Sequence, residues 1–316
     1  MRSALCLLLF CLSLSVSATG FPVLKTGVLH GGTVHWELSA MKAAGLDKAN
    51  GFELQVSTYA NMSATRLALS GGTVQAIVSD WLWAGQRGAQ GQALWFVPYS
   101  RSIGRVMVSS DSTLKWPEQL KGKRIGVAGG PFSKGWMLLQ ADAKKAGLDL
   151  KKEAVVKFAA PPLLSSELER GNLDVLVTFW RFGARLEAKG FKRLLDLDQV
   201  SQSLGLSSQM PMLGYVLDRQ WALSHKAAAQ GFERAVAETK ELLAEEPDRW
   251  LPLKPLMKAK NTAEFNALKA GYLAGIAAPL DQAQIDSAIS FYKLIDQSRT
   301  KPTGLPLNPS LFRLEP

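Results

Sequence analysis

Short apolar runs alternate with segments of helical periodicity through the first two thirds of the chain. In the first hundred residues the pattern predicts strands at 24–29, 52–59, 76–78 and 94–99, with helices at 33–44 and 64–69 between them. We expect Thr33, Ser63 and Asp80 to cap the helices that follow them, because short polar side chains bind the free N–H groups of a first turn. This alternation is typical of a parallel α/β sheet.

A second series of the same kind runs from about residue 106 to about residue 208. It predicts strands at 124–127, 154–158, 175–178 and 192–195, with helices that end at Ala146, span 164–170 and run through Arg185. A strand at 213–217 follows, and the last third is then helical, with one helix at 226–245 and others starting at Pro247, Thr262 and Asp281. The proline-rich segment 302–316 is expected to lie on the surface.

The first eighteen residues have the pattern of a secretory signal peptide. A basic start at Arg2 precedes the apolar run 4–12, and Val16-Ser17-Ala18 supplies the small residues of a cleavage site after Ala18. The apolar run is too short for a membrane anchor, which needs about 20 residues. Both cysteines lie inside this segment, so the exported chain is expected to have no disulfide, thiolate metal site or cysteine nucleophile.

The formal net charge of +10 changes the picture little. The basic residues are scattered rather than clustered, and export separates the chain from nucleic acid, so we expect no nucleic-acid partner. A mild attraction for anionic solutes or for the inner-membrane surface fits the charge better.

Three motifs resemble those of a known family. Residues 116–127 read WPEQLKGKRIGV, residues 171–175 read GNLDV, and residues 69–76 read LSGGTVQA. In this order and spacing they resemble type II periplasmic solute-binding proteins of ABC importers, in the nitrate, sulfonate and taurine class that also contains thiamine-pyrimidine precursor binders.

The resemblance implies an α/β fold of two lobes, each a mainly parallel sheet flanked by helices. Residues 19–104 and 210–316 would form lobe 1, and residues 105–209 would form lobe 2. The two crossovers would act as a hinge that closes on the ligand.

Ligands of open α/β sheets bind beyond the carboxyl ends of the strands, which directs attention to the residues there. In lobe 1 the candidates are His30, Gly32 and Trp36 after the first strand, and Asp80 and Trp81 after the third. The glycine allows close approach of the backbone, and the helix start favours an anion. Each residue has a plainer interpretation: Asp80 as a helix cap, and the tryptophans as core.

In lobe 2 a glycine-rich turn precedes a helix, and Gly130, Phe132, Ser133 and Lys134 are candidates to hold a carboxylate, sulfonate or phosphate. An ordinary capped turn would look the same. Trp180, at the end of a strand, is the strongest aromatic candidate.

Three further residues lie beside the expected ligand. Arg181 follows Trp180 and would pair with an anion or remain solvated, while Ser102 and Tyr215 lie at the crossovers. Ser102 would donate to the ligand, and Tyr215 would line the site or pack the hinge. His30 and His35 lack a third nearby ligand, so no metal site is expected.

The function predicted from these residues is a transport receptor. A small polar solute, such as a sulfonate, a pyrimidine-like compound or another anion or zwitterion, would bind between the lobes, and the closed form would dock on an inner-membrane ABC permease. We expect a periplasmic monomer without cofactor or catalytic residues. Two alternatives stay open: a binding module that serves a sensor or a periplasmic enzyme, and an enzyme that resembles pyrimidine synthases.

Overall fold

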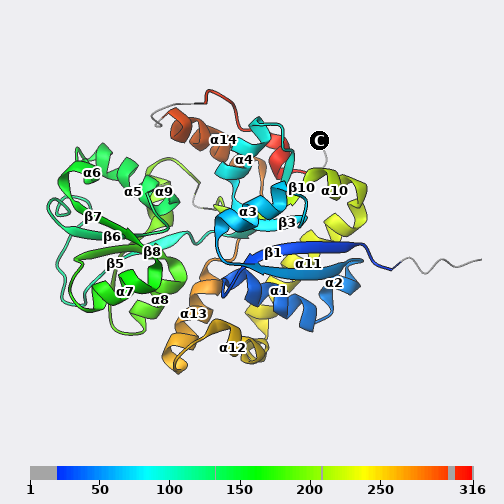
Figure 1. Ribbon diagram of the computed structural model, residues 1–316, viewed down its shortest axis with the longest axis horizontal. Helices are drawn as coiled ribbons and strands as arrows, with labels where there is room; N and C mark the ends of the chain where they lie inside the picture. Colours follow the sequence, from blue (N-terminus) through cyan, green and yellow to red (C-terminus); the bar gives the residue numbers. More distant parts are fainter. Residues whose placement is uncertain (1–19, 132, 208, 298–302, 315–316) are drawn as a thin grey trace, which may run out of the picture.

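The chain forms two sheets of five strands, each covered by helices on both faces, in the computed structural model of Figure 1. The structure describes residues 20–131, 133–207, 209–297 and 303–314. The predicted signal peptide and Phe132 therefore lie outside the described residues.

We call the first sheet and its helices lobe 1. Its strand order is β2-β1-β3-β10-β4, in which β1, β2 and β3 are parallel and β10 is antiparallel to both of its neighbours. The bounds are β1 Val23–Leu29, β2 Glu53–Tyr59, β3 Ala76–Asp80, β4 Leu94–Ser100 and β10 Leu213–Asp218. The helices before the crossover are α1 Thr33–Ala43, α2 Leu46–Ala49, α3 Met62–Ser70 and α4 Trp81–Ala89.

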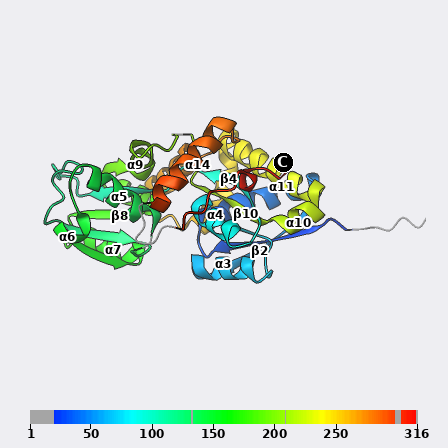
Figure 2. The ribbon, with the colours of Figure 1, turned by 90° about the horizontal axis from the view of Figure 1, so that it is seen from above.

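The helical last third of the chain also belongs to lobe 1. It comprises α10 Arg219–Ser224, α11 Lys226–Glu245, η1 Pro247–Leu253, α12 Lys254–Met257, α13 Thr262–Ala274, α14 Gln282–Gln297 and η2 Pro309–Phe312. Helices α1 and α11 pack on one face of the sheet, while α4, α14 and η2 pack on the other (Figures 1 and 2). Successive residues of β10 divide between these two cores: Tyr215 and Leu217 belong to the first, and Val216 to the second.

The second sheet and its helices form lobe 2, with the equivalent order β7-β6-β8-β5-β9. The strands are β5 Gly104–Val108, β6 Arg124–Ala128, β7 Val155–Ala159, β8 Val175–Phe179 and β9 Lys192–Asp196. The helices are α5 Lys134–Lys145, α6 Leu150–Glu153, α7 Pro161–Glu169, α8 Trp180–Glu187 and α9 Leu197–Ser203. The chain leaves lobe 1 between β4 and β5 and returns to it between α9 and β10.

Some local predictions need correction. Helix α1 is capped by Gly32, and Thr33 is its first residue, while Asn61 rather than Ser63 caps α3 through a bond from the Ala64 N–H. The segment 303–314 is not only a surface strap, because Leu307, Leu311, Phe312 and Leu314 are buried in lobe 1. Their apolar side chains recur between the prolines and fill the space beside α4.

Candidate ligand-binding site between the lobes

Each lobe presents a glycine turn and a helix start at the carboxyl edge of its sheet. In lobe 1, Gly31 has a φ of +67° and Gly32 caps α1 without any side-chain bond. In lobe 2, Gly129 and Gly130 have φ values of +86° and +83°, and Ser133 caps α5, again without a side-chain bond. Side chains therefore leave the first-turn N–H groups of both helices uncapped, an arrangement that suits an anion or a polar acceptor.

Three contacts join these edges across the gap between the lobes. The Lys134 Nζ lies 3.1 Å from an Asp80 carboxylate oxygen. The Arg181 guanidinium donates to the carbonyl oxygen of Gly31. The third contact is aromatic, since the rings of Trp36 and Trp180 meet edge to face at 6.3 Å. We use the name interlobe site for the residues of these contacts and their neighbours, which are Gly31, Gly32, Thr33, Trp36, Arg66, Asp80, Ser133, Lys134, Trp180 and Arg181.

Asp80 is the buried acid of the interlobe site. It accepts from the Trp83 N–H at 2.8 Å, as the predicted cap should, and from Arg66 at 2.9 Å. Burial alone would raise the pKa of Asp80, but the charges of Lys134 and Arg66 together with the Trp83 N–H outweigh it, so the pKa lies below its ordinary value. Asp80 thus stays ionised at neutral pH and is already neutralised by two cations.

Arg181 is a largely enclosed cation without an acidic partner among the described residues. Its guanidinium contacts the Gly31 carbonyl and lies over the Phe182 ring, and burial together with the Arg185 charge lowers its pKa. Arg185 of α8 and Arg105 of β5 differ, because Arg185 pairs with Glu264 at 2.6 Å and Arg105 pairs with Glu187 at 2.5 Å. The interlobe site therefore carries more positive than negative charge.

The aromatic candidates occupy different places. Trp180 is only 7 % exposed, because its ring packs between Trp36 and Gly271 of α13. The preceding residue, Phe179, is 37 % exposed and lies beside Gly129 at the mouth of the lobe 2 turn. Trp180 therefore fills the contact between α8 and α13, while Phe179 has open surface.

Two candidates lie in the core of lobe 1. Trp81 is fully buried against Phe291 and Phe312, and Tyr215 is fully buried with its hydroxyl on Glu37. This placement leaves neither side chain a surface for a ligand. The helical period turns Trp81 inward at the start of α4, and Trp83 instead lies under the Arg66 guanidinium.

The other candidates lie around the edges. His30 is exposed in the turn after β1, and Ser102 is half-buried in the crossover, where its hydroxyl packs against Gly275, the residue that follows α13. The Ser133 Oγ is buried and has no hydrogen-bond partner among the described residues, so it offers an unused polar group beside the Gly129-Gly130 turn.

Sequence reasoning missed two members of the interlobe site. Arg66 lies on α3, fourteen residues before its partner Asp80, and no local motif links them. Thr33 was expected only as a cap, yet its hydroxyl accepts from Tyr99 on β4 at 2.9 Å. A third residue near the site, Glu37, could have been found from the sequence, because it is a carboxylate within an apolar stretch. Glu37 is fully buried behind Thr33.

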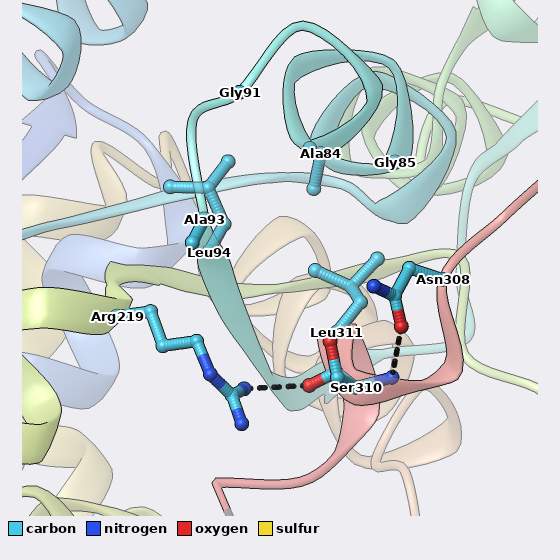
Figure 3. A pocket seen from close by; sticks show the side chains of 10 residues that line it. Ala84, Gly85, Gly91, Ala93, Leu94, Arg219, Asn308, Ser310 and Leu311 are labelled. Carbon is cyan, nitrogen blue, oxygen red and sulfur yellow. Dashed lines mark hydrogen bonds between the residues drawn. The ribbon is translucent and has the colours of Figure 1, made fainter.

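A cavity of about 120 Å³ lies elsewhere, at the opposite edge of the lobe 1 sheet (Figure 3). Arg219 borders it and donates to the carbonyls of Ser310 and Arg313. Small residues of α4 and the following turn line another part of it, among them Ala84, Gly85 and Gly88. This hollow marks where the C-terminal segment packs on lobe 1, and the charged groups described above do not border it.

Within the described ranges, no group of three or more His, Cys, Asp or Glu side chains could hold a metal ion. Nor does any described helix combine the length and apolar character needed to cross a membrane.

Comparison with known proteins identifies the family to which this architecture belongs. The family model described as "NMT1/THI5 like" matches residues 33–250, which include every strand of the two sheets except β1. The chain belongs to the NMT1/THI5-like family. This confirms the family resemblance found in the motifs. No curated protein matches the chain.

Solved structures confirm the two-lobed fold of this NMT1/THI5-like protein. It is similar to the alkanesulfonate-binding protein SsuA from Xanthomonas axonopodis pv. citri bound to MOPS, with a TM-score of 0.69, 19% identity, and coverage of 91% of this chain and 97% of that one. It is also similar to the periplasmic aliphatic sulphonate binding protein SsuA from Escherichia coli, with a TM-score of 0.70, 18% identity, and coverage of 90% of this chain and 89% of that one. The Candida albicans CA3427 gene product, described as having the generic periplasmic binding protein fold, is similar as well. Its TM-score is 0.60 at 14% identity, and the match covers 89% of this chain and 92% of that one.

Proposed function

We propose that this protein is the periplasmic solute-binding component of an ABC importer and that it holds a small organic anion between its lobes. The observation that carries the proposal is Arg181, an enclosed guanidinium that finds no acceptor among the described residues other than a backbone carbonyl. An enclosed charge without a counter-charge is costly, and an acidic ligand would supply the missing partner.

The surroundings of Arg181 support the same ligand class. Its contact residue Gly31 leads directly into the uncapped start of α1, where N–H groups favour negative charge. On the other side of the site, the unpartnered Ser133 hydroxyl and the uncapped start of α5 would hold a second polar group of the ligand. Asp80 does not favour an amine, because Arg66 and Lys134 already neutralise it.

Family membership and fold make a receptor role the best interpretation of this site. The names of two similar structures specify sulfonates, so we take alkanesulfonates as the first anions to test. In this proposal, closure of the lobes buries the anion, and the closed form is what an inner-membrane permease recognises. The contacts across the gap are then the contacts that ligand closure strengthens.

The test is calorimetric titration of the purified protein with 1-propanesulfonate, taurine, nitrate, a carboxylate series and neutral amides. We expect one class of acid to bind, and Arg181→Gln to weaken that binding at least about thirtyfold, because truncating one partner of a buried charged contact costs about 2 kcal/mol or more.

Arg170→Gln is the matched control, since it removes the same charge from an exposed residue at the end of α7. Binding of amides or amines in preference to every acid would overturn the proposed ligand class. Turnover of any compound in the series would overturn the receptor role.

A further inference from the structure

Behind the start of α1 lies a buried cluster of ionisable side chains that the proposed function does not use. The Glu37 carboxylate accepts hydrogen bonds from the hydroxyls of Tyr215 and Tyr272, and the Lys240 Nζ lies 3.5 Å from it. The Lys240 ammonium also lies over the ring of Tyr99, 5.6 Å from its centre. The cluster therefore contacts Tyr99 through Lys240.

Tyr99 connects the cluster to the interlobe site. Within the part of the chain that the structure describes, its hydroxyl forms a hydrogen bond with one group, the Thr33 Oγ1 at 2.9 Å. Burial and the Glu37 charge raise the pKa of Tyr99 far above its ordinary value, so the phenol keeps its proton at any physiological pH. In the hydrogen bond between the two side chains, the Tyr99 hydroxyl donates to the Thr33 Oγ1.

One proton of the pair is then left over. Two hydroxyls share a single hydrogen bond, and neither forms a second one with the described residues. Thr33 is 8 % exposed and Tyr99 is 3 % exposed, so little water is available to accept that proton. A buried donor without an acceptor is unfavourable in a folded protein, and such a group needs an explanation.

The position of Thr33 indicates where the acceptor belongs. Thr33 is the first residue of α1 and directly follows the Gly31-Gly32 turn, whose carbonyl is bound by Arg181. Since Tyr99 approaches from the core, the free proton of the Thr33 hydroxyl is directed away from Tyr99.

We propose that the Thr33 hydroxyl is a ligand-binding donor of the interlobe site and that Tyr99, fixed by the Glu37–Lys240 cluster, is the positioning residue that aims it. The inference rests on the proposed function and adds a specificity element to it. The favoured ligand carries an acceptor oxygen beside the charge that Arg181 meets, as a sulfonate, phosphonate or carboxylate does. An anion too small to reach both groups gains less.

The binding experiment uses 1-propanesulfonate and inorganic sulfate with five forms of the protein. These are wild type, Thr33→Ser, Thr33→Val, Tyr99→Phe and the double variant Thr33→Val/Tyr99→Phe. Thr33→Val should weaken binding about tenfold to a hundredfold, the range for a hydrogen bond to a charged group, while Thr33→Ser keeps the hydroxyl and should bind within about threefold of wild type.

A cycle of variants separates positioning from general structure. Tyr99→Phe should weaken binding when Thr33 is present and have no further effect when Thr33 is replaced by valine, because Tyr99 acts through that hydroxyl. Equal effects of Tyr99→Phe in both backgrounds would contradict the positioning role. Wild-type affinity in Thr33→Val would contradict the donor role.

If wild type binds neither probe, that result counts against the proposed ligand class alone. A measurement without ligand then still tests the roles of Thr33 and Tyr99. The double variant removes both hydroxyls and keeps the shapes of the side chains, so it removes the surplus proton. Its melting temperature without ligand should equal or exceed that of wild type. A melting temperature several degrees lower would show that the pair serves the fold, and the inference would fail.

Discussion

Lys134 at the start of α5 and Asp80 at the end of β3 form an ion pair, 3.1 Å long, that joins the two lobes. The Asp80 side chain is only 4% exposed, and it also accepts from Arg66 and from the Trp83 N–H. One carboxylate therefore caps a helix, orders α3 against β3 and links the lobes. Loss of its charge should affect all three contacts together.

Acid should weaken this link. The folded-state pKa of Asp80 is held below its ordinary value of 3.8 by Lys134 and Arg66 despite burial, so the unfolded chain takes up the proton first. The stabilisation is present above the ordinary pKa and is lost as the pH falls through the folded-state pKa. At neutral pH, Asp80→Asn should lower the free energy of unfolding by ~3 kcal/mol, as expected for a broken buried pair.

Urea unfolding from pH 7 down to pH 3 checks this prediction. The difference between wild type and Asp80→Asn should shrink toward the acid end, while the exposed control Asp248→Asn should differ little from wild type throughout. A difference that stays constant with pH would show that the Asp80 charge is not the source of the stability.

The order of strands and helices was largely predictable, since buried strands read as apolar runs and amphipathic helices repeat every three to four residues. Strand β5 escaped notice because Gly104-Arg105-Val106-Met107-Val108 is short and carries an arginine. That arginine is accommodated by Glu187 and Asp196, a pairing across other elements that the local sequence does not encode.

The backbone of the site was its most predictable part. Glycine turns before helices indicate the carboxyl edges, so Gly32, Gly130 and Ser133 could be placed there from the sequence. Side-chain direction depends on packing between distant segments: Phe291 and Phe312 turn Trp81 into the core, and Gly271 provides the space for Trp180. Arg66 and Lys134 meet at Asp80 only after both lobes have formed.

Gly271→Ala should push the lobes apart. A Cβ at Gly271 would lie 2.7 Å from the Trp180 ring, which cannot retreat because Trp36 lies against it. We expect a cost of ~1–3 kcal/mol for overpacking, partly offset by the better helix propensity of alanine, and a larger radius of gyration in X-ray scattering.

Gly88→Ala in α4 is the control for helix propensity, since a Cβ there meets nothing within 4 Å. It should leave the radius of gyration unchanged and the stability equal or slightly higher. If the Gly271 variant behaves like the Gly88 variant, Trp180 does not depend on Gly271 for its place between the lobes.

Breaking the buried pair of Glu37 and Lys240 should be more costly than removing it. Glu37→Gln leaves the Lys240 ammonium, 7% exposed, without its counter-charge, and we expect a loss of ~3–5 kcal/mol in chemical denaturation. Replacing both residues, as in Glu37→Gln/Lys240→Met, removes the uncompensated charge and should recover part of that loss. A double variant no more stable than Glu37→Gln would mean that Lys240 is not a buried charge.

Alkaline pH should destabilise the protein through its buried tyrosines. Burial first, and then the Glu37 charge, raise the pKa values of Tyr99, Tyr215 and Tyr272 well above the ordinary value of 10.0. Their contribution is complete below the ordinary pKa and is lost as the pH rises toward the folded-state values, because only the unfolded chain releases the phenolic protons. Lys240 acts in the opposite direction, since burial lowers its pKa, but its effect ends near its ordinary value of 10.5.

The fall in stability should therefore be sought above a pH of about 10.5, where each of the three tyrosines contributes up to about 1.4 kcal/mol per pH unit. Denaturant unfolding at a series of alkaline pH values measures the slope, and phenolate absorbance of the folded protein shows which tyrosines titrate. Tyr215→Phe removes one phenol and should reduce the slope by about one third. If the folded protein released all its phenolic protons near pH 10, the tyrosines around Glu37 would be open to solvent, and the enclosure of Tyr99 that positions Thr33 would be lost with them.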